Sequence, residues 1–119
     1  MNPYQILSSG GKVIGRYFLD PFPACPKIAI SHGLEIFPEF RRHGYGTQAQ
    51  KDRQKVAIEL GYDVLLATVR VGNIPEEKIL QKSGWKQVTN FFNTASDHDV
   101  GLWLCNLKDP YKDWIGPCR

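Results

Sequence analysis

The residues best suited to do chemistry lie at positions 36–47, which read Ile-Phe-Pro-Glu-Phe-Arg-Arg-His-Gly-Tyr-Gly-Thr. An apolar segment comes first, and a Gly-x-Gly turn made by Gly44 and Gly46 then leads into a predicted helix. Glycine lets the backbone turn tightly and brings its N–H groups close to a ligand. The N-terminus of the next helix adds unpaired donors and partial positive charge, which suits a diphosphate. Cationic or donor side chains follow one another beside the turn: Arg41, Arg42 and His43.

Three other interpretations of the glycines compete with a diphosphate site. The dinucleotide fingerprint needs G-x-G-x-x-G, but position 49 is Ala49 and no third glycine is near. The phosphate loop G-x-x-x-x-G-K-[ST] is absent, and Gly10-Gly11-Lys12 followed by Val13 is more typical of a hairpin turn. The third interpretation is a purely structural loop, which a Gly-x-Gly taken alone does not exclude.

Alternating strand and helix patterns surround the turn. We expect strands at Tyr4–Leu7, Lys12–Leu19, Ile28–Ile36, Val64–Val71, Lys86–Asn93 and Val100–Leu107. Helices are expected at Thr47–Leu60, ended by Gly61, and from Pro75 to about Lys82. The segment Asp20–Lys27 should be a loop, because its three prolines cannot serve a central ladder. The tail from Asp109 is expected to pack as an irregular strap.

The first helix is expected to be amphipathic. Its core-facing residues would be Ala49, Val56, Ala57 and Leu60, and its outward residues Gln50, Lys51, Arg53 and Gln54. The order β-β-β-α-β-α-β-β then defines an α/β (α+β) fold. We expect a mixed, mostly antiparallel twisted sheet of about six to seven strands, covered by two or more helices.

Bulk properties narrow the class of protein. The 119 residues suit one domain, 1–119, and the net charge of +3 is too small for a general nucleic-acid binder. Cys25, Cys105 and Cys118 are widely spaced, which indicates reduced thiols in a cytoplasmic setting. No zinc spacing occurs and no apolar run could span a membrane.

The pattern Arg41-x-x-Gly44-x-Gly46, preceded by Ile36-x-Pro38, resembles the acetyl-CoA loop of the GNAT superfamily of N-acetyltransferases. The later order of strand, Asn73, short helix and Gly84-Trp85 is similar to that family as well. The resemblance covers roughly residues 28–104. It implies a GNAT-like fold, acetyl-CoA as co-substrate, no metal, and an amine as acceptor.

The resemblance also assigns residues to the cofactor. It places the backbone of Leu34–Phe37, including Ile36 and Phe37, along the pantetheine arm. The residues implied for the loop and beyond it are Arg41, Arg42, His43, Gly44, Tyr45, Gly46, Thr47 and Asn73. Lys51 and Arg53 would reach the 3′-phosphate, although a solvated helix face is the more common role of such residues. Asn73 would contact the cofactor, cap the next helix, or do both.

The general base and acid are less well defined. Glu35 is the first candidate for the base, acting through water, and His32 is the second; alternation places them on opposite faces unless a bulge intervenes. The family's usual acid is a tyrosine on the short helix, and the matching position here is Leu80. Asp97-His98-Asp99 is interpreted as solvated turn residues in place of a metal site.

The leading hypothesis is therefore an acetyl-CoA-dependent N-acetyltransferase, an acyltransferase enzyme. A typical member begins with a strand and two helices over the acceptor site, whereas only about 27 residues precede the central strand here. We therefore expect an open acceptor cleft, or one completed in a homodimer, and a macromolecular amine such as a protein lysine or aminoacyl group. A catalytically weak or inactive GNAT-fold protein that binds a partner protein is the alternative. Neither hypothesis involves a membrane or direct binding of nucleic acid.

Overall fold

Nine short segments carry the regular structure of the computed structural model, which describes residues 3–107. The strands are β1 (Tyr4–Leu7), β2 (Val13–Phe22), β3 (Cys25–Ile36), β4 (Val64–Arg70), β5 (Lys86–Asn93) and β6 (His98–Asn106). The helices are the short 3₁₀ helix η1 (Pro38–Phe40), α1 (Tyr45–Glu59) and α2 (Ile74–Lys82). The expected order of strands and α-helices is confirmed, with boundaries shifted by a few residues. The tail from Asp109 and Cys118 lie outside the described residues.

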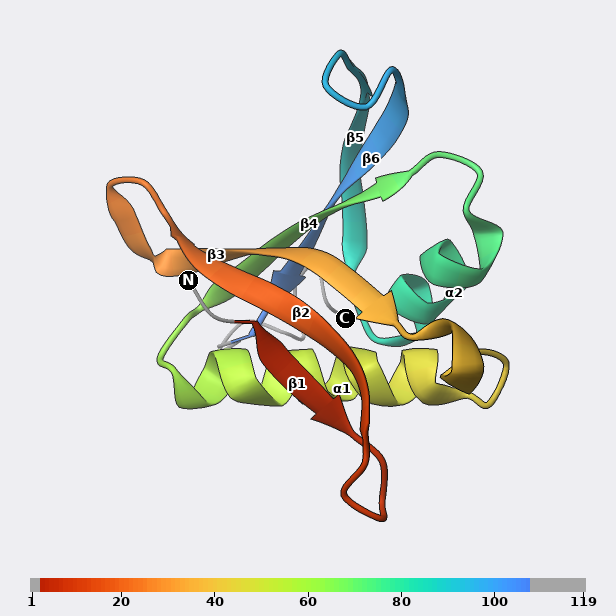
Figure 1. Cartoon of the computed structure of the whole chain (residues 1–119). Coiled ribbons are helices and arrows are strands. Elements are labelled where there is room, and N and C mark those ends of the chain that lie inside the picture. Colours follow the sequence, from red (N-terminus) through yellow and green to blue (C-terminus); the bar gives the residue numbers. More distant parts are fainter. Residues whose placement is uncertain (1–2, 108–119) are drawn as a thin grey trace.

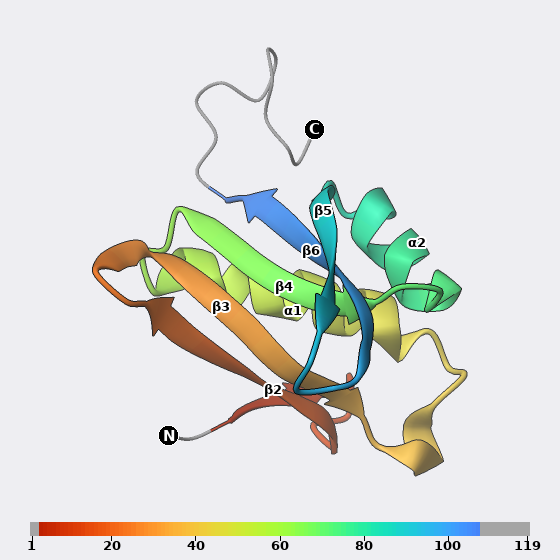
Figure 2. The same ribbon diagram turned by 90° about the horizontal axis from the view of Figure 1, so that it is seen from above.

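The six strands form one mixed sheet in the order β1-β2-β3-β4-β6-β5. Every neighbouring pair is antiparallel except β3 and β4, which are parallel and joined by a crossover through α1 (Figure 1). The β3–β4 ladder is short and pairs Ile28–Ile30 with Val64–Leu66. Beyond it the two strands separate toward their C-terminal ends (Figure 2). Within the described part of the chain, this separation leaves the β4-facing edge of β3 without a ladder partner from Ser31 onward.

Helix α1 lies along one face of the sheet, and α2 packs beside it (Figure 1). The fully buried core side chains come from both helices and from the strands: Ile6, Ile14, Tyr17, Ala29, Ala49, Ala57, Leu65 and Leu80. The Tyr17 hydroxyl donates to an Asp52 carboxylate oxygen at 3.0 Å, which ties β2 to α1. Odd-numbered residues of β2 near Tyr17 therefore face the helix, and Arg16 and Phe18 face the opposite side.

The expected outward face of α1 is partly wrong. Gln50 and Arg53 are buried, and only Lys51 is fully exposed among the four residues expected to face outward. Conversely, Leu60 is exposed at the C-terminal end of the helix. The polar residues are buried because α1 passes beneath the gap between β3 and β4, where the space to be filled is lined with polar groups.

The expected loop at Asp20–Lys27 is also wrong, because β2 and β3 continue through it as a hairpin. Only Pro23 and Ala24 turn the chain, and Ala24 adopts a φ of 60°. β1 pairs with β2 only as far as Tyr17, so no described strand pairs with the outer edge of β2 beside Pro21. Proline is tolerated at an open edge because its missing N–H removes no ladder bond there.

A bulge interrupts the β2–β3 ladder near the C-terminal end of β3. Arg16 pairs with Glu35 and Phe18 pairs with His32, so three steps along β3 match two steps along β2. Gly33 lies in the bulge with a φ of +65°, and a Cβ there would meet the Phe18 ring at 2.8 Å. The bulge places His32 and Glu35 on the same face of the sheet, the one opposite α1.

Candidate active site

Helix α1 begins at the glycine turn that the sequence singled out. Gly44 is the N-cap residue with a φ of 78°, and neither a side-chain cap nor an acidic residue in the first turn is present. The first N–H groups of an α-helix have no partner within the helix. At α1 they are left for an anion, which the helix dipole also favours.

A pocket of about 490 Å³ opens beside this helix terminus. Seven of the ten residues implied for cofactor binding line it: Ile36, Arg41, Arg42, Gly44, Tyr45, Gly46 and Asn73. Phe37 and His43 line none of the described pockets, although the rings of His43 and Tyr45 lie 5.9 Å apart. A Cβ at Gly46 would lie 3.0 Å from Ile79, so the close approach of α1 and α2 accounts for this second glycine.

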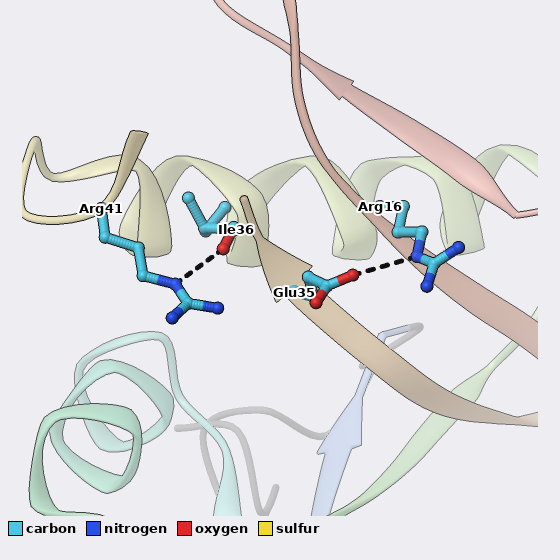
Figure 3. Close-up of polar contacts among 4 residues, drawn as sticks. All are labelled: Arg16, Glu35, Ile36 and Arg41. Atoms are coloured by element: carbon cyan, nitrogen blue, oxygen red, sulfur yellow. Dashed lines mark hydrogen bonds and ion pairs between the residues drawn. The ribbon is translucent and has the colours of Figure 1, made fainter. Parts of the chain in front are cut away.

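Arg41 connects the loop to the end of the central strand. Its Nε donates to the Ile36 carbonyl at 2.8 Å, and the side chain extends back across the end of β3 (Figure 3). The guanidinium thus holds the chain between η1 and α1 against β3 and lies at the wall of the pocket. Sequence spacing alone suggested a charged loop residue, and the structure adds this positioning contact.

A second pocket, of about 260 Å³, lies in the gap between β3 and β4. Its lining includes Ser31, His32, Leu34, Arg53, Arg70 and Glu76. Asn73 and Glu76 line both pockets, so the two adjoin each other at α2; together they are called the groove below. The Asn73 Oδ1 accepts from the Glu76 N–H at 3.5 Å, so Asn73 caps α2 while it lines the groove.

Thr47 and Lys51 belong to a third pocket, of about 620 Å³, between the two α-helices. Lys82 from the end of α2 lines the same pocket, together with Gln54 and Ser83. Two lysines on facing helices attract an anionic group. The signal for Lys82 was absent from the sequence pattern, because the contact joins two helices.

His32 has the surroundings of a positioned base. Its Nε2 lies 2.5 Å from an Asp20 carboxylate oxygen, and its ring stacks on Phe18 with centroids 5.2 Å apart. A carboxylate that accepts from Nε2–H fixes the proton on that nitrogen and leaves the lone pair on Nδ1. Sequence reasoning missed Asp20, because the hairpin that brings it opposite His32 was expected as a loop.

Glu35 has different neighbours. Its Oε1 pairs with the Arg16 Nε at 3.2 Å on the exposed face of β2 and β3 (Figure 3). Glu35 lines none of the described pockets. The bulge brings the two candidate bases to one face, but only His32 borders the groove.

Arg53 lies beneath the gap between the two parallel strands. It is 3% exposed, donates to the Ser31 hydroxyl at 3.0 Å and to the Gln50 side chain, and lies over the Trp85 ring at 4.8 Å. Among residues 3–107, its Nε finds no hydrogen-bond partner. Burial lowers the pKa of Arg53 to about 10, against the opposing effect of Glu76. Burial likewise raises the pKa of Glu76, and the Arg53 cation opposes that rise.

The comparison with protein families agrees with the geometry. The model of the acetyltransferase (GNAT) family matches residues 2–85, most of the chain. The chain therefore belongs to the GNAT family of acetyltransferases, whose activity is that of an acyltransferase enzyme. No curated protein matches it in sequence.

Solved structures share the fold at low sequence identity. A protein provisionally assigned as a phosphinothricin N-acetyltransferase is 22% identical, with a TM-score of 0.75 over 88% of this chain and 67% of that one. Spermidine N-acetyltransferase from Vibrio cholerae, in complex with CoA and spermine, is 15% identical, with a TM-score of 0.75 over 88% and 64%. The NatC complex bound to Gag peptide and CoA has a TM-score of 0.67 at 14% identity over 79% and 61%. The chain thus spans about two thirds of these chains.

Within residues 3–107, no group of three or more His, Cys, Asp or Glu side chains could hold a metal ion. None of the helices in that range is long and apolar enough to cross a membrane. Asp97, with a φ of 60°, ends the turn before β6, and His98 and Asp99 begin that strand.

Proposed function

We propose that this protein transfers an acetyl group from acetyl-CoA to an amine. The observation that carries the proposal is the uncapped N-terminus of α1 behind Gly44, which opens into a groove leading to the gap between β3 and β4. This arrangement offers donors for a diphosphate at one end. It offers an unpaired strand edge for an extended arm at the other.

The residues present fit such a co-substrate. The N–H groups that begin α1 and the side chain of Arg42 would hold the diphosphate, and the edge of β3 would align the arm. Lys51 and Lys82 would receive the 3′-phosphate in the pocket between the helices. Acetyl-CoA would supply an acyl group activated as a thioester. Every other role falls to residues of this chain.

His32 is the base that we propose, with Asp20 as its positioning residue. A lysine-like amine has an ordinary pKa near 10.4, so making it neutral near pH 7.4 costs about 4 kcal/mol. A base beside the gap removes the proton as the amine nitrogen forms its new bond. Glu35, the first candidate from the sequence, becomes the second here, because it forms an ion pair with Arg16 on the sheet surface.

The class of acceptor stays open. The expected preference for a macromolecular amine gains no support from the structural neighbours, because their names include spermidine and phosphinothricin as well as a peptide complex. The outer face of β2 and β3, with His32 half-exposed, admits an amine of either kind. We propose an amine acceptor without restricting its size.

Calorimetric titration with acetyl-CoA tests the cofactor site, and mass spectrometry of a panel of amines and peptides tests the transfer. We expect Gly44→Val to weaken acetyl-CoA binding at least tenfold, because a β-branched residue disfavours the φ that directs the N–H groups. Gly11→Val, at a φ of +84° in a distant turn, is the matched control. Equal affinities of the two variants would contradict the proposed site.

A partner-binding protein without turnover is the second candidate. Leu80, at the position where the resemblance places an acid, is fully buried in the core and favours this alternative. Tight CoA binding with no acetylated product across the panel would select it. Acetylated product that disappears in His32→Gln would exclude it.

A further inference from the structure

Arg53 is a buried cation to which the transfer proposed above assigns no task. Its guanidinium is held by Ser31 and Gln50 and covered by Trp85, while no described residue pairs with its Nε. Burying a charge costs free energy that an apolar residue of similar volume would avoid. A buried charge that lines a pocket is therefore a candidate for a functional role.

The position of Arg53 in the groove determines which part of a bound ligand would lie next to it. Ser31 and Ala67 are the first residues beyond the ladder, and both line the pocket together with Arg53. From Ile36 back to Ser31 the strand covers roughly 17 Å at about 3.3 Å per residue. An extended arm of about that length, starting from a diphosphate at α1 and following β3, would end above Arg53.

We propose that Arg53 stabilises the thiolate of CoA as it leaves, an inference that rests on the proposed function. In the transfer, the amine nitrogen forms a bond to the acyl carbon and the carbon–sulfur bond breaks. Sulfur keeps the electron pair of that bond, and the amine proton passes to the base. Negative charge thus develops on sulfur at the apex of the gap, where a fixed, buried cation stabilises it.

Other ionisable groups face the same space. Glu76 approaches from α2, His32 from β3 and Arg70 from β4, while Tyr17 and Cys105 approach Arg53 from the core side. The negative charge of Glu76 opposes the proposed effect. Burial raises the pKa of Glu76, and the neighbouring Arg53 cation opposes that rise.

The direct test measures the pKa of the bound CoA thiol. The signal is the ultraviolet absorbance of the thiolate during a pH titration. The proteins compared are wild type, Arg53→Met, Arg53→Lys and Lys55→Met, the last removing one charge from the exposed side of α1. We expect the bound thiol pKa in wild type and Lys55→Met to lie about 1 to 3 units below that in Arg53→Met. Arg53→Lys should retain most of the shift.

A second measurement uses wild type alone, so it does not depend on the folding of a variant. Affinity for CoA should rise with pH between the bound and free thiol pKa, whereas affinity for S-methyl-CoA, which cannot ionise, should stay level. An equal thiol pKa in wild type and Arg53→Met, or parallel pH profiles for the two ligands, would overturn the role of Arg53. Absence of CoA binding to wild type is a different result and would overturn the proposed function itself.

Discussion

His32 and Glu35 are separated by three positions in the sequence and share a face of the sheet, yet their surroundings differ. His32 is tied to Asp20, stacks on Phe18 and borders the groove. Glu35 forms an exposed ion pair, an interaction that contributes little to stability. Glu35 ranked first from the sequence. The contacts that favour His32 cross between β2 and β3, so residue type gives no sign of them.

His32→Gln should lower kcat/KM by about 100-fold or more, since general-base catalysis contributes roughly 10²–10⁴-fold. Glu35→Gln should change it less than about threefold, because its carboxylate lies outside the groove. Steady-state kinetics with the best acceptor of the panel measure both, and acetyl-CoA affinity serves as the control. A larger loss in Glu35→Gln than in His32→Gln would reverse the assignment.

At the scale of elements, β3 is the strand on which the site depends. Its bulge at Gly33 brings Glu35 to the face of the sheet on which His32 lies, and its edge beyond Ile30 offers backbone groups to a ligand. Helix α2 completes the groove through Asn73 and Glu76. The bulge in β3 and the short β3–β4 ladder weaken the sheet locally, and the same two features leave room for the groove.

Gly33→Ala should reduce the free energy of unfolding by about 2–4 kcal/mol. About 1–2 kcal/mol comes from a non-glycine residue at positive φ, and the rest from the contact with Phe18. Gly11→Ala, at positive φ with no atom near its Cβ, should cost only the first part. Urea denaturation of both variants gives the difference, and equal losses would show that the Phe18 contact is easily relieved.

Glu76 gives α2 a pH-dependent contribution to stability. Its pKa is raised in the folded state by burial, so the folded protein binds the proton more tightly than the unfolded chain does. The free energy of unfolding that Glu76 contributes therefore falls as pH rises above its ordinary value of 4.5. Glu76→Gln should unfold at higher urea than wild type at pH 7, and the advantage should shrink toward pH 4. Glu77→Gln, on the same helix, is the control; a constant advantage across pH would contradict the prediction.

At the scale of the whole molecule, the groove lies between two walls that belong to different parts of the sheet. One wall is β3, which pairs with β2 and which Arg41 connects to the loop before α1. The other wall is β4 with α2. Only the short ladder at Ile28–Ile30 joins the two strands directly. A ligand that spans the groove would bridge the two walls and add contacts that the free protein lacks.

Binding of acetyl-CoA should therefore stabilise the fold strongly. At a ligand concentration of 100 times Kd the gain is about 2.7 kcal/mol, which corresponds to a rise in Tm of roughly 10 °C. Thermal unfolding monitored by circular dichroism measures this rise, and 3′-dephospho-CoA at equal concentration should give a smaller one if Lys51 and Lys82 hold that phosphate. No shift with acetyl-CoA would argue against binding in the groove.

The sequence by itself determined the order of the elements and the loop at the start of α1. Local chemistry decides these: β-branched runs favour strands, Pro75 and Gly61 mark helix ends, and Gly44 is needed where φ is positive. The family resemblance rested on the same local spacing, and the family match confirms it.

Only the tertiary structure decided which polar residues enter the site. Asp20 reaches His32 across a hairpin, and Arg53 turns inward because α1 passes beneath a gap in the sheet. Such contacts join residues distant in the chain, and the helical period of 3.6 residues or the strand period of 2 residues does not predict them. Helix periodicity alone predicts that a charged residue such as Arg53 faces solvent. It is buried here because the divergence of β3 and β4 places hydrogen-bond partners beside it, which only the tertiary structure shows.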